Sequence, residues 1–332
     1  LIKNNPYDCM IIDFMLPDVS GYDFIRSVTE LKKIQLMPVI IYSAKDFLRK
    51  EKMQLKQYAN RILLKGTNSL DTLFDETIVH LHIDTAYGRE PLPAMRQIAK
   101  DWDFKLIEIA VPPPGLEQQS QWLQIRKEKA DWVTFWGAGS GMNSTAITTA
   151  ARVGFPREKM LGVWWAGSEE DVVPAGEAAK GYVSAAFSAS GSNFPVMQEI
   201  KAKVYGGGKG NLEDPTRLGN VMYTRGVVYG MIIVEAIRTA QAQFGKGKVV
   251  TPDQLRWGLE HLNLTEARIK ELGAPGLFPP IKTSCLDHEG SGMVKFQRWD
   301  GTGFKQVTPF MAGDRAMVRK MVEESAAKYA AE

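Results

Sequence analysis

Short, continuous apolar runs alternate with amphipathic segments through the first part of the chain. In residues 1–76 the apolar runs lie at 9–13, 38–42 and 61–65, and helical patterns lie at 22–31 and 49–58. A continuous apolar run is typical of a strand buried on both faces, and such strands joined by helices form parallel sheets. The pattern therefore predicts a doubly wound α/β unit over residues 1–76.

The same alternation starts again near residue 77. Strands are predicted at 78–83, 105–111, 131–136, 160–165 and 182–187. Helices are predicted at 87–102, 117–129 and 144–153. These segments predict a second parallel, doubly wound sheet over residues 77–193.

From residue 194 the pattern changes to long helices and then to short strands. Helices are predicted at 194–205, 217–244 and 252–262, and Pro252 suits the first turn of the last of these. Residues 281–307 predict a β meander with turns at 288–290 and 300–301, and 313–330 predict a closing helix. The predicted organisation is 1–76, 77–193, 194–280 and 281–332.

Composition narrows the function classes. The chain has 332 residues, of which 44% are hydrophobic and 24% charged, a balance typical of a globular protein of two or three lobes. The net charge of +3 does not favour a nucleic-acid surface. The sequence shows no apolar run of membrane-spanning length, and its first residues form neither a basic n-region nor an apolar h-region, so no signal peptide is expected among them. Cys9 and Cys285 form no metal or redox motif.

Three stretches of the first unit share a recognisable order: YDCMIIDFMLPDVSGYDFI, PVIIYSAKD and ILLKG. They resemble the receiver domain of two-component signalling, a flavodoxin-like fold. The resemblance implies that Asp13 is the phosphoacceptor and that Ser43 and Lys65 hold the phosphoryl oxygens. These residue types suit that chemistry, because a carboxylate can attack a phosphoryl donor while a hydroxyl and an ammonium bind its oxygens.

The first unit departs from the receiver pattern in two ways. The sequence has no match to the family's first two strands, which carry the acidic pair for Mg²⁺, and Gly66 stands where proline is usual. Mg²⁺ is therefore expected only if the receiver site functions. With the first strand missing from the order 2-1-3-4-5, the strand at 9–13 is expected to form an unpaired edge.

The remainder of the chain carries IDTAYGRE, DWVTFWGAGSG, MLGVWWAGSEED, EAAKGYVSA, a long helix RLGNVMYTRGVVYGMIIVEAIRTA and KFQRWDG. Over residues 78–332 it resembles type I periplasmic binding proteins for branched-chain amino acids and amides. The resemblance implies a two-lobe α/β trap in which the receiver-like fragment replaces most of lobe one. It also implies a non-enzymatic, periplasmic component of an ABC importer that binds a small solute and a membrane permease.

By the same resemblance, the ligand-facing residues follow the strand ends of the second lobe: Tyr87, Trp136, Gly137, Ala138, Gly139, Ser140, Trp164 and Trp165. Amino-acid binders of this family place an acid where the chain has Trp164. Glu169 either substitutes for that acid or begins a solvated helix. The tryptophan pair indicates a flat apolar or aromatic ligand, or a cation on a ring face, unless one of the two belongs to the core. For Tyr87 too there are two alternatives: its ring faces the ligand, or it packs at the start of a helix.

Other kinds of site find less support. The segment 137–141 lacks the third glycine of a dinucleotide fingerprint, because Met142 occupies that position, so no cofactor is expected. His80 and His82 alternate on one strand and share a face, as a packed or surface pair or as a metal pair.

Three functions stay open: solute binding for an ABC importer, a phosphoreceiver-coupled sensor, and a chimeric fusion with little native function. A chain expressed as given, without a signal peptide, is expected to remain in the cytoplasm.

Overall fold

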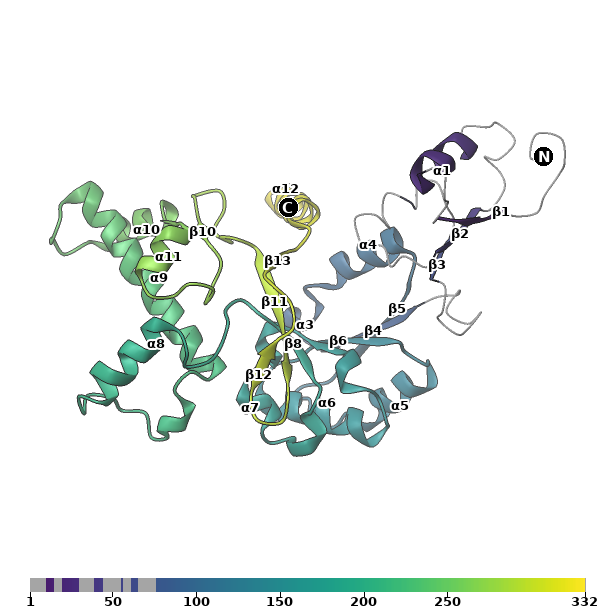
Figure 1. Cartoon of the computed structure of the whole chain (residues 1–332), viewed down its shortest axis with the longest axis horizontal. Helices are drawn as coiled ribbons and strands as arrows, with labels where there is room; N and C mark the ends of the chain where they lie inside the picture. Colours follow the sequence, from purple (N-terminus) through teal and green to yellow (C-terminus); the bar gives the residue numbers. More distant parts are fainter. Residues whose placement is uncertain are drawn as a thin grey trace. The chain divides into compact units, whose positions relative to one another are not determined.

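The structure is a computed structural model that describes residues 10–14, 20–29, 39–43, 55, 61–64 and 76–331. The chain separates into two compact units, Leu1–Glu76 and Thr77–Glu332. In Figure 1 the first unit is purple to dark blue and the second runs from blue to yellow. Each unit is described by itself below.

Three parallel strands form the sheet of the first unit: β1 (Met10–Asp13), β2 (Val39–Ser43) and β3 (Arg61–Leu64), in that order. Helix α1 (Gly21–Thr29) follows β1 and buries Ile25, while Ile12 and Ile41 are buried on the sheet. The predicted parallel strands are confirmed. Among the described residues β1 lies at the edge of this sheet, where Ile11 is 64% exposed. Cys9, Lys65 and most of 49–58 lie outside the described residues.

The second unit is built on an eight-stranded sheet in the order β12-β11-β8-β7-β6-β4-β5, with β13 paired to β11. Strands β4 to β8 are parallel, as predicted, and β11 is antiparallel to β8, so the C-terminal meander extends the large sheet. The strands are β4 (Thr77–Ile83), β5 (Lys105–Val111), β6 (Trp132–Trp136), β7 (Met160–Gly162), β8 (Val183–Ala186), β11 (Met293–Trp299), β12 (Phe304–Gln306) and β13 (Met311–Ala312).

Helices cover both faces of this sheet. In Figure 1, α4 (Leu92–Trp102) lies on one side, and α5 (Gln119–Lys127) and α6 (Ser140–Arg152) lie on the other. Side chains of a strand alternate between faces, so Leu81 of β4 joins the core made with α5 and α6. His80, with the opposite orientation, belongs to the other face.

Several boundaries differ from the sequence prediction for local reasons. The helix predicted at 87–102 is two helices, α3 (Ala86–Arg89) and α4, because Pro91 between them has no N–H to continue the hydrogen-bond ladder. The strand predicted at 160–165 ends at Gly162, and Trp164–Ala166 form a 3-10 turn whose Ala166 carbonyl accepts a hydrogen bond from Tyr182 Oη at 2.7 Å.

The helices after β8 form a second layer of the same unit. They are α8 (Pro195–Ile200), continued by a π-helical turn (Lys201–Tyr205), α9 (Val221–Phe244), α10 (Pro252–Glu260) and α11 (Glu266–Glu271). Gly258 allows α9 and α10 to pack closely, because a Cβ there would overlap the Ala236 carbonyl. Thr251 and Gln254 form a capping box at the start of α10.

The remaining elements are short or C-terminal. Strands β9 (Asn263–Leu264) and β10 (Ile281–Lys282) pair with each other, so the chain does turn at 289–291 but this turn joins no paired strands. The predicted turn at 300–301 joins β11 to β12. Short helical turns and the last helix complete the unit: Arg157–Lys159, α7 (Glu169–Val172), Gly176–Ala179, Pro215–Arg217 and α12 (Arg315–Ala331). None of the helices in the described part of the chain combines the length and apolarity needed to span a membrane.

The histidine pair on β4 is packed inside the unit. His80 and His82 are 1% and 3% exposed, and their rings stack with centroids 5.5 Å apart. His80 Nδ1 hydrogen-bonds with Thr134 Oγ1 at 2.8 Å, and His82 Nδ1 donates to the Ile83 carbonyl at 3.0 Å. Among the described residues no group of three potential metal ligands is present.

We expect His80 to make the fold sensitive to acid. Burial, reinforced by the neighbouring charge of His82, lowers the pKa of His80 to about 4, while an unfolded histidine titrates near 6.5. The neutral ring thus contributes stability that is fully present above pH 6.5 and lost as the pH falls towards 4. Between pH 7.5 and pH 5 the free energy of unfolding is expected to fall by about 2 kcal/mol through this residue.

Urea unfolding of the wild type and of His80→Gln at both pH values measures this contribution, because glutamine does not titrate. The matched control is His288→Gln, which removes a histidine whose side chain is mostly exposed. An equal pH dependence in the wild type and His80→Gln would contradict the prediction.

Candidate ligand-binding site

The order of the large sheet creates a crevice at the carboxyl ends of its strands. The chain leaves β4 towards β5 on one side and returns to β6 on the other, so the loops after β4 and β6 diverge. Tyr87 follows β4, the segment Gly137 to Ser140 follows β6, and Trp164 and Trp165 follow β7. The residues predicted from the sequence therefore gather at one end of the sheet.

Aromatic contacts connect these loops. Thr85 caps the short helix α3 and places the Tyr87 ring 6.0 Å from Trp136 and 5.2 Å, edge-on, from Trp165. Trp164 and Trp165 stack with planes 2° apart and centroids 5.5 Å apart. Trp164 and Tyr87 are half-buried and pack against the core, whereas Trp165 is 49% exposed. Of the two alternatives that the sequence left open, packing in the core thus applies to Trp164, whereas Trp165 exposes its ring to solvent.

A cavity of about 300 Å³ lies beside the tryptophan stack. Four predicted residues line it: Gly139, Ser140, Trp164 and Trp165. The other predicted positions, Tyr87, Trp136, Gly137, Ala138 and Glu169, are not part of its lining. Five further residues complete the lining: Ser168, Glu170, Asp171, Met222 and Arg225.

Arg225 is the residue that the sequence motifs missed most clearly. It lies on α9, yet its guanidinium lies 4.8 Å from the Trp164 ring centroid and donates to the Trp164 carbonyl at 3.2 Å. Burial lowers its pKa from the ordinary value of an arginine, but the group stays charged at neutral pH. Within the described part of the chain, no carboxylate forms an ion pair with it. The available signal was a charged residue in the largely apolar first half of α9.

The acidic residues after β7 are already paired. Asp171 is buried and accepts from Ser168 N at 2.8 Å and from Asn143 Nδ2 at 2.9 Å; desolvation nevertheless raises its pKa. Glu170 forms an ion pair with Arg217. These bonds hold the loop after β7 against α6, and only Glu170 Oε2 is left without a partner among the carboxylate oxygens that they involve.

Glu169 begins α7, but the expectation that it faces solvent is wrong. Its carboxylate is half-buried and accepts from the backbone N–H of Val221 at 3.0 Å, at the first residue of α9. Burial raises the pKa of this carboxyl. A carboxylate at a helix N-terminus is stabilised by the exposed N–H groups there, so Glu169 joins the sheet layer to α9.

Glycine in the loop after β6 is required by packing. A Cβ on Gly137 would overlap Asn143 Oδ1 and the Phe135 ring. Gly139 has φ +85°, which favours glycine, and it precedes α6, which consequently starts at Ser140 rather than at the predicted residue 144. The glycines therefore shape a tight turn above the sheet.

Five buried polar atoms near the crevice have no partner among the described residues: His80 Nε2, Tyr87 Oη, Trp136 Nε1, Asn143 Oδ1 and Glu170 Oε2. The rings of His80 and Trp136 lie 6.2 Å apart, and Trp136 contacts Tyr87. Burial raises the pKa of Tyr87 to about 12, so its hydroxyl remains a donor at neutral pH. Unused hydrogen-bonding groups are unusual in a finished core and common next to a ligand.

The receiver-like positions are only partly described. Asp13 and Ser43 end the neighbouring parallel strands β1 and β2, and Ser43 is fully buried, while Lys65 lies outside the described residues. The described residues contain no group of three acids, histidines or cysteines that could hold a metal ion.

Comparison with known families assigns both parts of the chain. A receiver-domain model of response regulators matches residues 1–76, and the periplasmic binding protein model matches residues 61–304, which is most of the chain. The chain belongs to the periplasmic binding protein family. This binding protein is also 29% identical over 70 residues to a two-component response regulator of Arabidopsis thaliana, a match that spans only 34% of that relative.

Solved structures agree with the fold of the binding protein. A structure described as an ABC transporter permease from the Pseudomonas fluorescens group is 35% identical, with a TM-score of 0.74, covering 97% of this chain and 79% of that one. A branched-chain amino acid ABC transporter protein from Thermus thermophilus with bound valine is 17% identical, with a TM-score of 0.59 and coverages of 92% and 78%. A solute-binding protein from R. palustris in complex with benzoate is 16% identical, with a TM-score of 0.53 and coverages of 89% and 77%.

The close packing around Gly137 predicts that a larger side chain at this position destabilises the binding protein. Gly137→Ala is expected to lower the free energy of unfolding by about 1–3 kcal/mol, because the new methyl group overlaps Asn143 and Phe135. Gly141→Ala is the matched control: its methyl group would meet only Leu116 Cδ2 at 3.2 Å, inside α6, where alanine is favoured by about 0.5–1 kcal/mol. Urea denaturation measures the free energy of unfolding of both variants. Equal values for Gly137→Ala and Gly141→Ala would refute the packing explanation.

Proposed function

We propose that this binding protein captures a small aromatic carboxylate and delivers it to the membrane permease of an ABC importer outside the cytoplasmic membrane. The observation that carries the proposal is Arg225, a charged guanidinium without a carboxylate partner in the described structure, lying on Trp164 beside the 300 Å³ cavity. Burying an unpaired charge is costly, so a site of this kind favours a ligand that supplies the counter-ion.

The aromatic stack supports a planar ligand. Trp165 exposes half of its surface next to the cavity, and a flat ring can pack on it in an offset or edge-on arrangement. The cavity volume lies at the lower end of the range for small-molecule sites, which suits one ring rather than a large solute.

The carboxylates near the cavity argue against a ligand ammonium. Glu169 binds the N-terminus of α9, Glu170 pairs with Arg217, and Asp171 is satisfied by Ser168 and Asn143. Glu169 and Asp171 are therefore engaged, and Arg217 balances the charge of Glu170, whose Oε2 has no hydrogen-bond partner in the described structure. A carboxylic acid without an α-amino group fits better than an amino acid.

Ligands recorded for similar structures are compatible with this choice. The R. palustris proteins were solved with benzoate and with 4-hydroxybenzoate, and the T. thermophilus protein with valine. These ligands belong to those proteins, and for this chain they define the compounds to test first.

Calorimetric titration with benzoate, benzamide and phenylalanine tests the proposal. Wild-type protein is expected to bind benzoate at least about tenfold more tightly than either of the others, because only benzoate both neutralises Arg225 and brings no unpaired ammonium. Arg225→Gln is expected to weaken benzoate binding about 10- to 100-fold and to abolish the preference over benzamide.

Arg238→Gln is the matched control, because Arg238 lies on the same helix, is mostly exposed and pairs with Glu235. It is expected to bind benzoate like the wild type. Benzoate affinity that is unchanged in Arg225→Gln would overturn the assignment. Failure of the wild type to bind any of the three would instead favour a fusion with little native function.

A further inference from the structure

The middle of helix α9 is apolar around its whole circumference. Residues 226–234, with the sequence GVVYGMIIV, contain no charged side chain. One side of the helix is packed, because Val228 belongs to a buried core and Gly258 of α10 lies against Ala236. A helix that is apolar all round is typical of one that is covered on every side.

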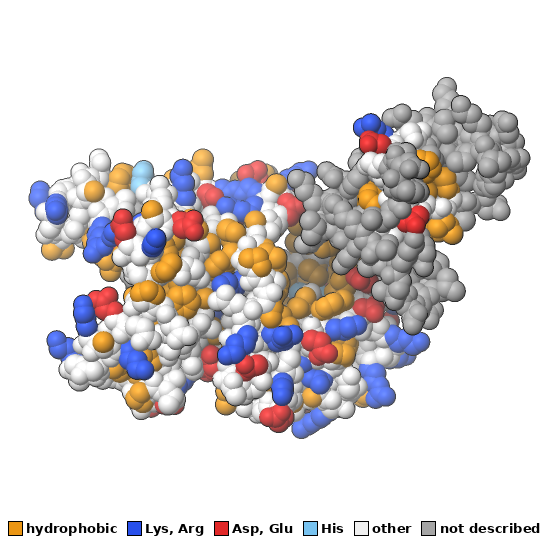
Figure 2. Space-filling model, viewed as in Figure 1, with side chains coloured by type: hydrophobic (Ala, Val, Ile, Leu, Met, Phe, Trp, Pro, Cys, Tyr) orange, Lys and Arg blue, Asp and Glu red, His pale blue; other side chains and the backbone are white. Residues whose placement is uncertain are grey.

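The side of α9 opposite Val228 is nevertheless open. Met222, Tyr229, Ile233 and Val234 are 46%, 51%, 49% and 47% exposed. Figure 2 shows hydrophobic side chains exposed on the helical layer. Two glycines lie between these residues, and a Cβ added to either would meet no atom of the described chain within 4 Å. We call this side the outer face of α9, made of Met222, Gly226, Tyr229, Gly230, Ile233 and Val234.

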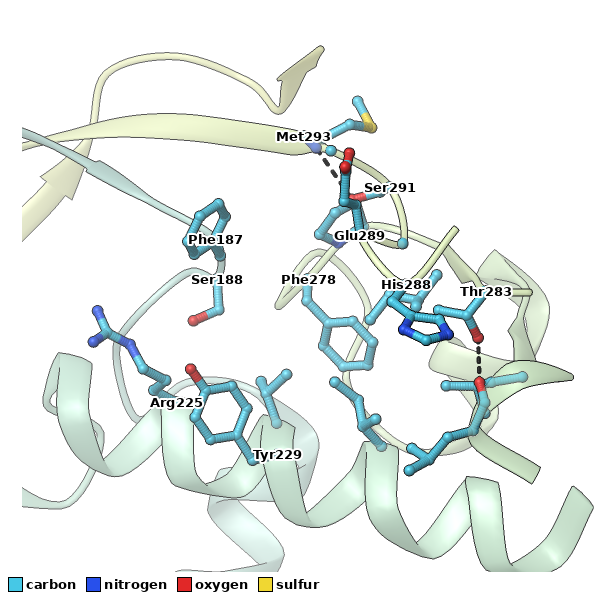
Figure 3. Close-up of a pocket in the computed structure, with 18 of the residues that line it drawn as sticks. Phe187, Ser188, Arg225, Tyr229, Phe278, Thr283, His288, Glu289, Ser291 and Met293 are labelled. Atoms are coloured by element: carbon cyan, nitrogen blue, oxygen red, sulfur yellow. Dashed lines mark hydrogen bonds between the residues drawn. The ribbon is translucent and has the colours of Figure 1, made fainter. Parts of the chain in front are cut away.

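The charged residue closest to the outer face lies beside it. A hollow of about 550 Å³ is lined by parts of α9, α10 and the segment 278–293. Figure 3 shows Arg225 and Tyr229 of α9 on the side of this hollow, so Tyr229 marks the edge of the outer face. Since one α-helical residue turns the direction by about 100°, Arg225 lies off the centre of the outer face. An uncharged surface of this kind favours an apolar partner over a polar or charged one.

The outer face is symmetric about the level of Val228. Gly226 and Gly230 lie two residues on either side of that level, and Met222 and Val234 lie six residues on either side. In an antiparallel pair of α9 helices with a twofold axis at this level, the glycines face each other. Met222 of one chain then faces Val234 of the second copy. This self-complementarity is what a twofold interface between identical chains requires.

The exposed area also suits a pair of identical chains. The open glycines allow two helix backbones to approach closely, and the larger side chains at both ends then interlock. Covering the exposed halves of the four large side chains on each copy, with the glycines between them, removes on the order of 1,000 Å² in total from water. That area lies at the lower limit of specific interfaces and corresponds to a weak, reversible dimer.

We infer that the outer face of α9 is a self-association surface, on which α9 of a second copy of this chain packs antiparallel about a twofold axis at the level of Val228. The apolar circumference, the open glycines and the symmetric spacing each support this occupant. The inference goes beyond the proposed function and does not depend on which ligand the cavity at the tryptophan stack binds.

A charge-exchange experiment tests both the surface and the direction of the helices. Sedimentation velocity without ligand, from about 1 to about 300 µM protein, is expected to show a wild-type dimer that forms in the micromolar range. Met222→Lys and Val234→Glu are each expected to weaken it at least about tenfold, because each places a charge opposite an apolar side chain of the second copy. An equal mixture of the two variants is expected to restore the dimer, because the new ammonium then faces the new carboxylate.

Val249→Glu is the matched control, because Val249 is 96% exposed and lies outside α9. Its monomer–dimer equilibrium is expected to equal that of the wild type. A wild-type protein that stays monomeric over the whole range would overturn the inference and show that another partner or none covers the face. An unchanged equilibrium in the single variants, or no recovery in their mixture, would overturn it as well.

Filling the open glycine position gives a second, opposite pair of effects. Gly230→Leu is expected to raise the thermal unfolding midpoint, because leucine favours a helix more than glycine does. The same variant is expected to weaken the dimer at least about tenfold, because the new side chain holds the two backbones apart. Ala242→Leu, at an exposed position of α9 away from the outer face, is the matched control and is expected to leave the dimer unchanged. A dimer of Gly230→Leu as tight as that of the wild type would contradict the close crossing and overturn the inference.

Discussion

Strand β4 is the element on which the ligand end of the second unit depends. It is buried on both faces along nearly its whole length and has parallel neighbours on both sides. Because the chain departs from β4 in one direction and returns on the other side, the loops after β4 and β6 cannot close over each other. The aromatic residues, the glycine turn and the smaller cavity all occupy the opening that this order leaves.

Contacts from α7 and its preceding turn tie this sheet layer to the helical layer. Glu169 binds the start of α9, Glu170 pairs with Arg217, and Arg225 lies on Trp164. The first two contacts involve a helix terminus and an ion pair, and the third a cation on a ring face, so each has a directional component. Together they hold Arg225 beside the cavity at the tryptophan stack.

The architecture could be predicted from the sequence because its signals are local. Continuous apolar runs identified β4 to β8 and the three strands of the first unit, and strand ends identified Tyr87, Gly139 and the tryptophan pair. Arg225 was missed because its contact with Trp164 joins residues 61 positions apart, on a helix that carries no loop motif. Pairing of β9 with β10 and the turn at Trp164 were missed because tertiary hydrogen bonds decide them.

Glu169 makes the joint between the two layers depend on pH. Its carboxylate accepts from the backbone N–H of Val221, the first residue of α9, and burial raises the pKa of this carboxyl. Protonation removes the negative charge that the N-terminus of a helix favours, and the raised pKa brings protonation on at a higher pH than in an exposed glutamate. Acid therefore weakens the attachment of α9 to the sheet layer through a single side chain.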